Sequence, residues 1–232
     1  NVIGGDPKLI KPLPENDLAI EFIGDSITCG YGVDCDDGDE SFSTATENFS
    51  KSYAYIAAEE LCADYSVVAY SGYGVISGYS SGERNAEETV PQYYDITSIH
   101  SSYNEKWDFS ERKIDAVVIN LGTNDTGYVY SEDKDTCDEF VNGYVLLLQD
   151  IRKANPDAAI ICTVGLMGGE ETIYPLIQKA VKKFDDDRTT CFLSTEMDIE
   201  KNGAGAGWHP SAKTQKEYGH VIADEIRKAI SE

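Results

Sequence analysis

The residues best suited to chemistry are a serine near the start of the chain and a histidine near its end. Ser26 stands in Gly24-Asp25-Ser26, directly after an apolar run at 19–23. His209 stands in Gly-Trp-His-Pro, where the following Pro210 suits the first turn of a helix. A Ser hydroxyl needs an adjacent base to become a good nucleophile. The pair predicts acyl transfer if the fold brings the two side chains together, with Ser26 as nucleophile and His209 as base.

The other two histidines fit a catalytic role less well. His220 lies within the pattern of the last predicted helix, which favours a surface or packing position, and His100 lies in a polar stretch without a motif. His209 is therefore the predicted base. The alternative interpretation of Ser26 is an ordinary Ser in a turn between a strand and a helix.

Acyl transfer also needs hydrogen-bond donors where negative charge develops on the substrate oxygen. The backbone N–H of Ser26 is one candidate donor. The others are the side-chain amide of Asn124 and the backbone N–H of Gly72 or Gly74, which follow apolar runs. Asn124 could instead cap a turn or a helix, as Asn often does.

Apolar and amphipathic segments alternate along the chain and predict the elements that position these residues. Buried strands are expected at 19–23, 67–70, 114–121, 158–164 and 190–194, and helices at 52–63, 83–93, 136–154, 171–184 and 210–230. This alternation predicts a three-layer, doubly wound α/β fold of the flavodoxin-like kind, with a parallel sheet of about five strands. The carboxyl ends of parallel strands share one edge, where the candidate residues are expected to converge.

The composition limits the partners of this protein. The 232 residues carry a formal net charge of -23, which repels phosphate backbones and anionic membranes. No apolar run approaches the ~20 residues that span a bilayer. We therefore expect neither a nucleic-acid partner nor a membrane, but a neutral substrate, and a monomer or small homo-oligomer. Hydrolysis by a Ser–His pair needs no metal or organic cofactor, so none is expected.

Six cysteines are spread along the chain without a Cys-x-x-Cys pair, which argues against a structural zinc site. Cys62 and Cys162 are expected to be small core residues. Cys29 and Cys35 could form a disulfide across a loop. The acidic stretch at 34–40 faintly resembles a calcium loop, but its spacing does not fit, and we expect a solvated loop.

Four short blocks resemble the conserved blocks of the SGNH (GDSL-type) hydrolases. They occur in that family's order, they span nearly the whole chain, and they are Gly24-Asp25-Ser26, Ser71-Gly72-Tyr73-Gly74, Gly122-x-Asn124-Asp125 and His209-Pro210. The longer stretches at 20–32, 42–49 and 51–54 resemble carbohydrate esterase family 2, bacterial enzymes that remove acetyl groups from plant polysaccharides. The resemblance implies that Ser26 is the nucleophile, that His209 is the general base, and that the N–H groups of Ser26 and Gly74 form an oxyanion hole with Asn124. Gly74 is preferred because it falls where the family's second-block Gly usually falls, and Gly72 is the alternative.

The chain departs from the family pattern in two places. The usual fourth block is Asp-x-x-His-Pro, but position 206 is Ala. Either a backbone carbonyl near Ala206 and Gly207 or another acid must hold the imidazole, and the resemblance favours the carbonyl because some family 2 members work as a Ser–His dyad. Family 2 enzymes also usually carry a jelly-roll domain before the hydrolase domain. Residues 1–17 are expected to be a leading arm or linker, with a possible origin as the tail of such a domain, and 18–232 the catalytic domain.

Aromatic residues gather at the predicted site edge, and aromatic faces suit sugar rings: Tyr31, Tyr73, Tyr79, Tyr128, Tyr130 and Trp208. We expect Trp208, Tyr73, Tyr79 and Asp25 to bind substrate, although Tyr also commonly fills helix–sheet interfaces. The predicted function is a serine esterase that hydrolyses O-acetyl esters on xylan, glucomannan or related polysaccharides. The alternatives are a lipase or thioesterase acting on longer acyl chains, or a non-catalytic carbohydrate-binding module. The resemblance implies an extracellular or cell-surface bacterial location.

Overall fold

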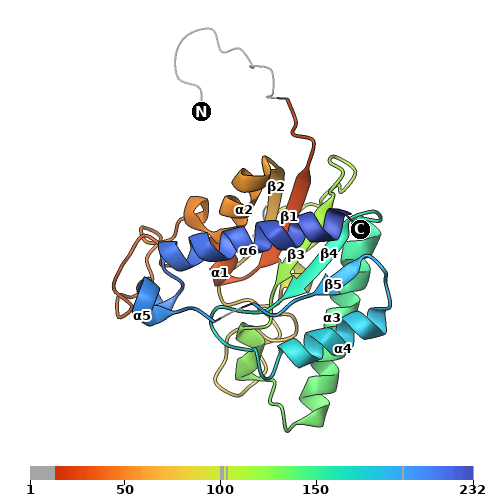
Figure 1. Ribbon diagram of the computed structural model, residues 1–232. Coiled ribbons are helices and arrows are strands. Elements are labelled where there is room, and N and C mark those ends of the chain that lie inside the picture. Colours follow the sequence, from red (N-terminus) through yellow and green to blue (C-terminus); the bar gives the residue numbers. More distant parts are fainter. Residues whose placement is uncertain (1–13, 100–101, 103, 195, 232) are drawn as a thin grey trace.

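A five-stranded parallel sheet forms the centre of the molecule (Figure 1). The computed structural model describes residues 14–99, 102, 104–194 and 196–231. The strand order is β2-β1-β3-β4-β5, and every pair is parallel. The strands are β1 Ala19–Gly24, β2 Asp64–Ala69, β3 Ala116–Asn120, β4 Ala159–Thr163 and β5 Thr189–Cys191. The predicted doubly wound α/β fold is confirmed.

Helices cover both faces of the sheet and complete three layers (Figure 1). The helices α2 and α6 pack on one face, and α3 and α4 pack on the other. The α-helices are α1 Ser26–Cys29, α2 Tyr53–Leu61, α3 Lys134–Ala154, α4 Tyr174–Phe184, α5 Ile199–Asn202 and α6 Ala212–Ser231. Short 3-10 helices lie at η1 Phe49–Lys51, η2 Val90–Gln92, η3 Asn124–Gly127 and η4 Ala206–Trp208.

The central strands are mostly apolar, as suits strands that are buried on both faces. Every residue of β1, β3 and β4 is buried, whereas the edge strand β2 is only partly covered. Along β1, Phe22 packs into the core under α2 and α6, and the next residue, Ile23, packs into the core under α3 and α4. The alternation of side chains along a strand therefore divides the apolar residues between two cores.

The strand register aligns the loops that carry the candidate residues. Gly24 at the end of β1 pairs with Ala69 on β2 and with Asn120 on β3, and Asn120 pairs with Thr163 on β4. All four strands therefore end at the same edge of the sheet. The segments that contain Ser26, Gly72, Gly74 and Asn124 begin directly beyond this edge.

The predicted helix at 83–93 is wrong, because most of this segment pairs with the loop after β2. Only Val90–Gln92 is helical, as η2. The carbonyl of Glu88 accepts the N–H of Gly74, and Gly74 in turn accepts the N–H of Val90. These long-range backbone bonds occupy groups that a helix would need.

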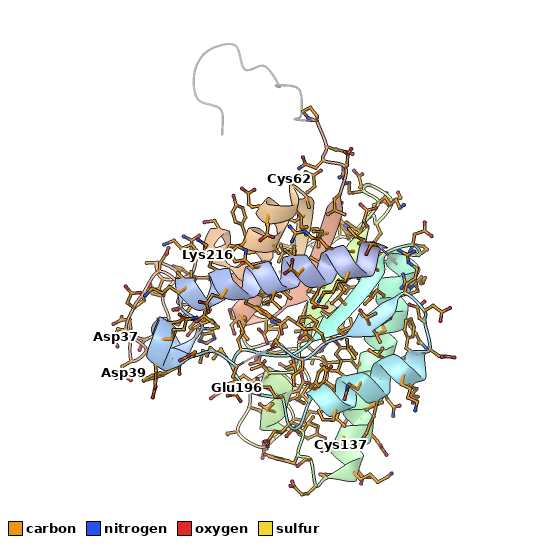
Figure 2. All side chains as sticks on the ribbon, in the orientation of Figure 1. Asp37, Asp39, Cys62, Cys137, Glu196 and Lys216 are labelled. Carbon is orange, nitrogen blue, oxygen red and sulfur yellow. The ribbon has the colours of Figure 1, made fainter. Side chains whose placement is uncertain are left out.

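The cysteine predictions have mixed outcomes. Cys162 is buried in the core, as expected, but Cys62 is exposed at the end of α2 (Figure 2). Its φ of 50° places it in the left-handed conformation that ends a helix, and this turn directs the residue away from the core. Cys29 and Cys35 are free thiols, so the possible disulfide between them is not formed.

Two sequence predictions fall wholly or mainly outside the described residues. Residues 1–13 of the expected leading arm lie outside the described part, and so does His100. The described end of the arm is attached to β2, since Asn16 donates its backbone and side-chain N–H groups to Asp64. Within the described ranges, no helix is both long and apolar enough to cross a membrane.

Candidate active site

Ser26 and His209 meet at the carboxyl edge of the sheet, although 183 positions separate them in the chain. Ser26 is the first residue of α1, one residue beyond the end of β1, and its Oγ lies 2.9 Å from Nε2 of His209. The serine is 8% exposed, so a substrate would approach it from one side. The geometry is that of a nucleophile in contact with its base. His220, by contrast, pairs with Glu60 on the surface, as expected for a non-catalytic histidine.

A peptide carbonyl holds the His209 ring where the family pattern has a carboxylate. Nδ1 lies 3.0 Å from the carbonyl oxygen of Gly207. When Nδ1–H donates to this oxygen, Nε2 is left unprotonated and can accept the proton of Ser26 Oγ. Of the two alternatives for replacing the missing acid at Ala206, the structure has the carbonyl.

Two consecutive left-handed residues direct this carbonyl at the imidazole. Gly207 has φ 60° and Trp208 has φ 58°. The acidic loop at 34–40 fixes the turn, because Gly207 donates its N–H to the carbonyl of Glu40 at 2.9 Å and Trp208 donates to the carbonyl of Gly38 at 3.2 Å. A left-handed Trp is uncommon and strained, so these bonds stabilise a conformation that the local sequence does not favour.

The surroundings of His209 favour its neutral form. Burial lowers the pKa of its imidazole below the usual value, and the carbonyls of Gly207 and Ala206 oppose the change only in part. A neutral imidazole can accept a proton, so this environment suits a general base near neutral pH.

The structure corrects the preference for Gly74 as a backbone donor. The N–H of Gly74 is donated to the carbonyl of Glu88 at 3.1 Å. Gly72, the alternative, has φ 86°, and a Cβ built on it would meet no described atom within 4 Å. The position of Gly74 relative to β2 could not reveal that its N–H is occupied, because the carbonyl of Glu88 comes from a loop with no recognisable motif. Because the Gly74 N–H is occupied, Gly72 is the remaining candidate of the two.

Asn124 lies between the nucleophile and the loop after β2. Its Nδ2 donates to the carbonyl of Tyr73 at 2.9 Å and lies 3.3 Å from Oδ2 of Asp25. The side chain does not cap η3, which begins at Asn124 itself. The shorter bond fixes the amide plane, and the longer bond to Asp25 is the weaker of the two and the easier one for another acceptor to replace.

Asp125 is a site residue whose role the sequence analysis missed. Its buried carboxylate accepts three backbone N–H groups, those of Val75 and Ile76 at 2.8 Å and Ser77 at 3.0 Å. Burial raises the pKa of this carboxyl to about 6, although the three N–H bonds oppose the change. Asp125 thereby joins the loop after β3 to the loop after β2, which carries Gly72. The only signal in the sequence was its place beside Asn124.

Asp25 does not face a substrate, which corrects the prediction that it binds one. The residue is 1% exposed, and its Oδ1 accepts the N–H of Ile27 at 3.0 Å, which caps α1. Burial raises the pKa of this carboxyl to about 7, with nearby Asp125 adding to the effect. Its role is to hold the turn that presents Ser26.

The predicted sugar-binding aromatics divide into one buried ring and two exposed ones. Tyr73 is 8% exposed and packs edge-on against Tyr70 and Tyr93, so its ring belongs to the core, contrary to prediction. Trp208 is 51% exposed and Tyr79 is 75% exposed. Sugar binding by these two residues stays a prediction.

The surface beside Trp208 is acidic. Asp37 and Asp39 project from the loop beneath its indole ring into solvent (Figure 2). In the described part of the chain, no three or more His, Cys, Asp and Glu side chains are grouped so that they could hold a metal ion.

Residues 22–216 match the GDSL-like Lipase/Acylhydrolase family. With the Ser26–His209 contact and the parallel sheet beneath it, the chain belongs to this family. A solved structure of a family two carbohydrate esterase from Clostridium thermocellum, in complex with cellohexaose, is 31% identical and has a TM-score of 0.84. That match covers 97% of this chain and 68% of the solved one. The predicted resemblance to SGNH hydrolases, and among them to carbohydrate esterase family 2, is confirmed.

Two further proteins are similar to this chain over most of its length. The cellulase/esterase CelE of Acetivibrio thermocellus is 32% identical over 231 residues, which are 97% of this chain and 27% of CelE. An acetylxylan esterase / glucomannan deacetylase of Cellvibrio japonicus is 26% identical over 234 residues, which are 94% of this chain and 62% of that protein. The chain therefore spans only part of the length of both relatives.

Proposed function

We propose that this protein is a serine esterase that removes O-acetyl groups from carbohydrates through a Ser26–His209 dyad. The observation that carries the proposal is the 2.9 Å contact between Ser26 Oγ and His209 Nε2, with Nδ1 held by the Gly207 carbonyl. Neutral imidazole in this orientation can accept the serine proton without a carboxylate.

The reaction has two halves. In the first, His209 takes the proton of Ser26 as Oγ attacks the acetyl carbonyl, and the tetrahedral intermediate collapses when His209 returns the proton to the sugar oxygen. The sugar leaves and the acetyl group stays on Ser26. In the second half, His209 takes a proton from water, the resulting hydroxide oxygen attacks the acyl carbon, and acetate leaves as Ser26 regains its proton.

Three donors are proposed to hold the oxyanion of both tetrahedral intermediates. They are the N–H of Ser26, the N–H of Gly72 and Nδ2 of Asn124. The N–H of Ser26 lies at the start of α1, where backbone N–H groups have no partner within the helix. Asn124 would exchange its 3.3 Å contact with Asp25 for a bond to the oxyanion. Such donors lower the barrier because they already point to where charge develops.

The proposed substrates are acetylated xylan, glucomannan and related polysaccharides. The name of the Cellvibrio japonicus relative supports these substrates, and the net charge of -23 favours uncharged chains. Exposed Trp208 and Tyr79 could each offer a ring face to a sugar. Because such polysaccharides are too large to enter cells, we propose an extracellular or cell-surface location on a bacterium.

Acetate release tests the proposal. The wild-type chain is incubated with acetylated xylan, acetylated glucomannan and the 4-nitrophenyl esters of acetate and octanoate. Ser26→Ala and His209→Ala are expected to lose turnover while they keep the wild-type circular dichroism spectrum. Ser110→Ala is the matched control, because Ser110 is exposed and its hydrogen bonds to described residues lie within its own loop, to Asp108.

The possible results separate the alternatives. Acetate release that disappears in Ser26→Ala supports the esterase. Faster turnover of octanoate than acetate favours a lipase or thioesterase instead. Binding of xylan by an inert wild-type protein favours a non-catalytic binding module, and full activity of Ser26→Ala rejects Ser26 as the nucleophile.

A further inference from the structure

An aromatic ring covers one face of the His209 imidazole. The Tyr31 ring lies with its centroid 3.9 Å from that of the imidazole, and the two planes differ by 26°. The ring of Phe42 stacks on Tyr31, at 4.5 Å and 24°. We call Phe42, Tyr31 and His209 the aromatic stack. Sequence analysis named Tyr31 only as one of several aromatics at the site edge.

The backbone attaches Tyr31 to both halves of the dyad. Its N–H donates to the carbonyl of Ser26 at 3.1 Å, so it belongs to the turn that presents the nucleophile. The adjacent Gly32 has φ 69° and accepts the N–H of Ala206 at 3.1 Å, in the loop that carries His209. A Cβ on Gly32 would lie 2.5 Å from the carbonyl oxygen of Ala206, so the approach of the two loops requires glycine.

The ring face can stabilise the charge that His209 gains during the reaction. When the imidazole takes the serine proton it becomes a cation, and the face of an aromatic ring attracts a cation. The groups around the imidazole are Ser26 Oγ, the carbonyls of Gly207 and Ala206, and the Tyr31 ring. Among the described residues, the ring nitrogens of His209 contact Ser26 Oγ and the Gly207 carbonyl, and neither nitrogen is hydrogen-bonded to a carboxylate. Burial and Glu47 raise the pKa of the Tyr31 hydroxyl, so this group is neutral at the pH of catalysis.

We propose that Tyr31 is a positioning residue for His209: its ring face fixes the imidazole plane and stabilises the imidazolium, and so takes over part of the role of the missing orienting acid. This inference rests on the proposed function. The hydrogen bond from Nδ1 to the Gly207 carbonyl fixes one edge of the imidazole. Stacking against Tyr31 restricts the rotation of the imidazole ring about this hydrogen bond.

Two substitutions of Tyr31 test the proposal, one that removes the aromatic ring and one that keeps it. Tyr31→Leu keeps an apolar side chain over His209 but has no ring, and Tyr31→Phe keeps the ring but has no hydroxyl. Tyr65→Leu is the matched control, because Tyr65 is an exposed ring on β2 that packs with Phe49 and Tyr55. Thermal melting checks that each variant folds.

Kinetics on 4-nitrophenyl acetate should distinguish the variants. We expect Tyr31→Leu to lower kcat roughly ten- to hundredfold with KM changed by less than about twofold, and Tyr31→Phe to stay within about threefold of wild type. The acid limb of the kcat/KM profile should move to lower pH in Tyr31→Leu, because the imidazolium loses its partner, and should not move in Tyr31→Phe. The proposal is overturned if Tyr31→Leu has the wild-type kcat, or if its acid limb does not move or moves to higher pH. An equal loss of kcat in Tyr31→Phe would overturn it as well.

A proton NMR titration gives a readout independent of turnover. In a Ser26→Ala background, the His209 imidazole signal is assigned by its loss in His209→Asn. We expect its midpoint to fall in Tyr31→Leu and to be retained in Tyr31→Phe, and a midpoint that rises in Tyr31→Leu would contradict the role of Tyr31. If the wild type is inert on every ester, the proposed function fails, while the titration still decides whether the ring stabilises the imidazolium.

Discussion

Asp125 should support both the stability of the fold and the geometry of the oxyanion site. Its carboxylate accepts the N–H groups of Val75, Ile76 and Ser77, and it is completely buried. Asp125→Ala leaves three buried donors without a partner, at about 2 kcal/mol each, or about 6 kcal/mol in all. The change also removes the penalty of ionising a carboxyl whose pKa is raised from 3.8 to about 6, which is worth about 3 kcal/mol above pH 6. The net expected loss in the free energy of unfolding is about 3 kcal/mol at pH 7.5.

The assay is urea unfolding at pH 7.5, followed by circular dichroism, together with kcat on 4-nitrophenyl acetate. We expect kcat to fall as well, because the released loop carries Gly72 and the carbonyl of Tyr73 that orients Asn124. Asp125→Asn keeps one acceptor oxygen and should lose less stability. Asp138→Ala, which removes an exposed carboxylate paired with Lys134, should leave the unfolding curve unchanged. A loss below about 1 kcal/mol in Asp125→Ala, with wild-type kcat, would refute the reasoning.

Three further outcomes follow from the site. Burial raises the pKa of Asp25 from 3.8 to about 7 in the folded state, so the native state holds this proton more tightly and the contribution of Asp25 to stability falls as pH rises from about 4 to 7. Asp25→Asn should therefore gain up to about 4 kcal/mol over wild type by pH 8 and nothing near pH 4, and equal stability curves by urea unfolding at both pH values would contradict this. Gly207→Ala places a side chain in a left-handed position 3.1 Å from the Tyr31 ring, and should cost about 1 kcal/mol or more in unfolding while lowering kcat. A wild-type kcat and unfolding curve would contradict the requirement for glycine at this turn. Asn124→Ala should lower kcat on the order of 10²–10³-fold if its amide holds the oxyanion, and an unchanged kcat in the ester assay would remove it from that role.

The fold could be predicted from the sequence because its central strands are buried on both faces. The runs that became β1, β3 and β4 are mostly apolar, with Glu21 as the one charged residue, and this pattern identifies parallel strands under helices. The segment at 83–93 could not be predicted in the same way. Its periodicity suggested a helix, but its backbone groups bond to the loop after β2, and sequence spacing does not report such long-range partners.

The candidate site was predictable where side chains carry the chemistry and unpredictable where the main chain does. Ser26, His209 and Asn124 stand out by type and by their position after strands, and the fold brings all three to one edge. The choice of Gly72 over Gly74 depends on which N–H a distant carbonyl has already taken. The burial of Asp25 likewise depends on packing, because a carboxylate beside a nucleophile looks the same in sequence whether it faces substrate or caps a helix.

The left-handed turn at Gly207 and Trp208 determines which mutations can disturb the orientation of the general base, His209. In a Ser–His–Asp triad, one codon specifies the group that orients the histidine, and a single base change can delete it. Here the orienting group is a peptide carbonyl, which every amino acid possesses, and its direction is fixed by the carbonyls of Gly38 and Glu40. Substitutions in this loop that keep the path of the backbone therefore leave the base oriented. Loss of that orientation must instead come from changes in loop length or glycine content that redirect the backbone.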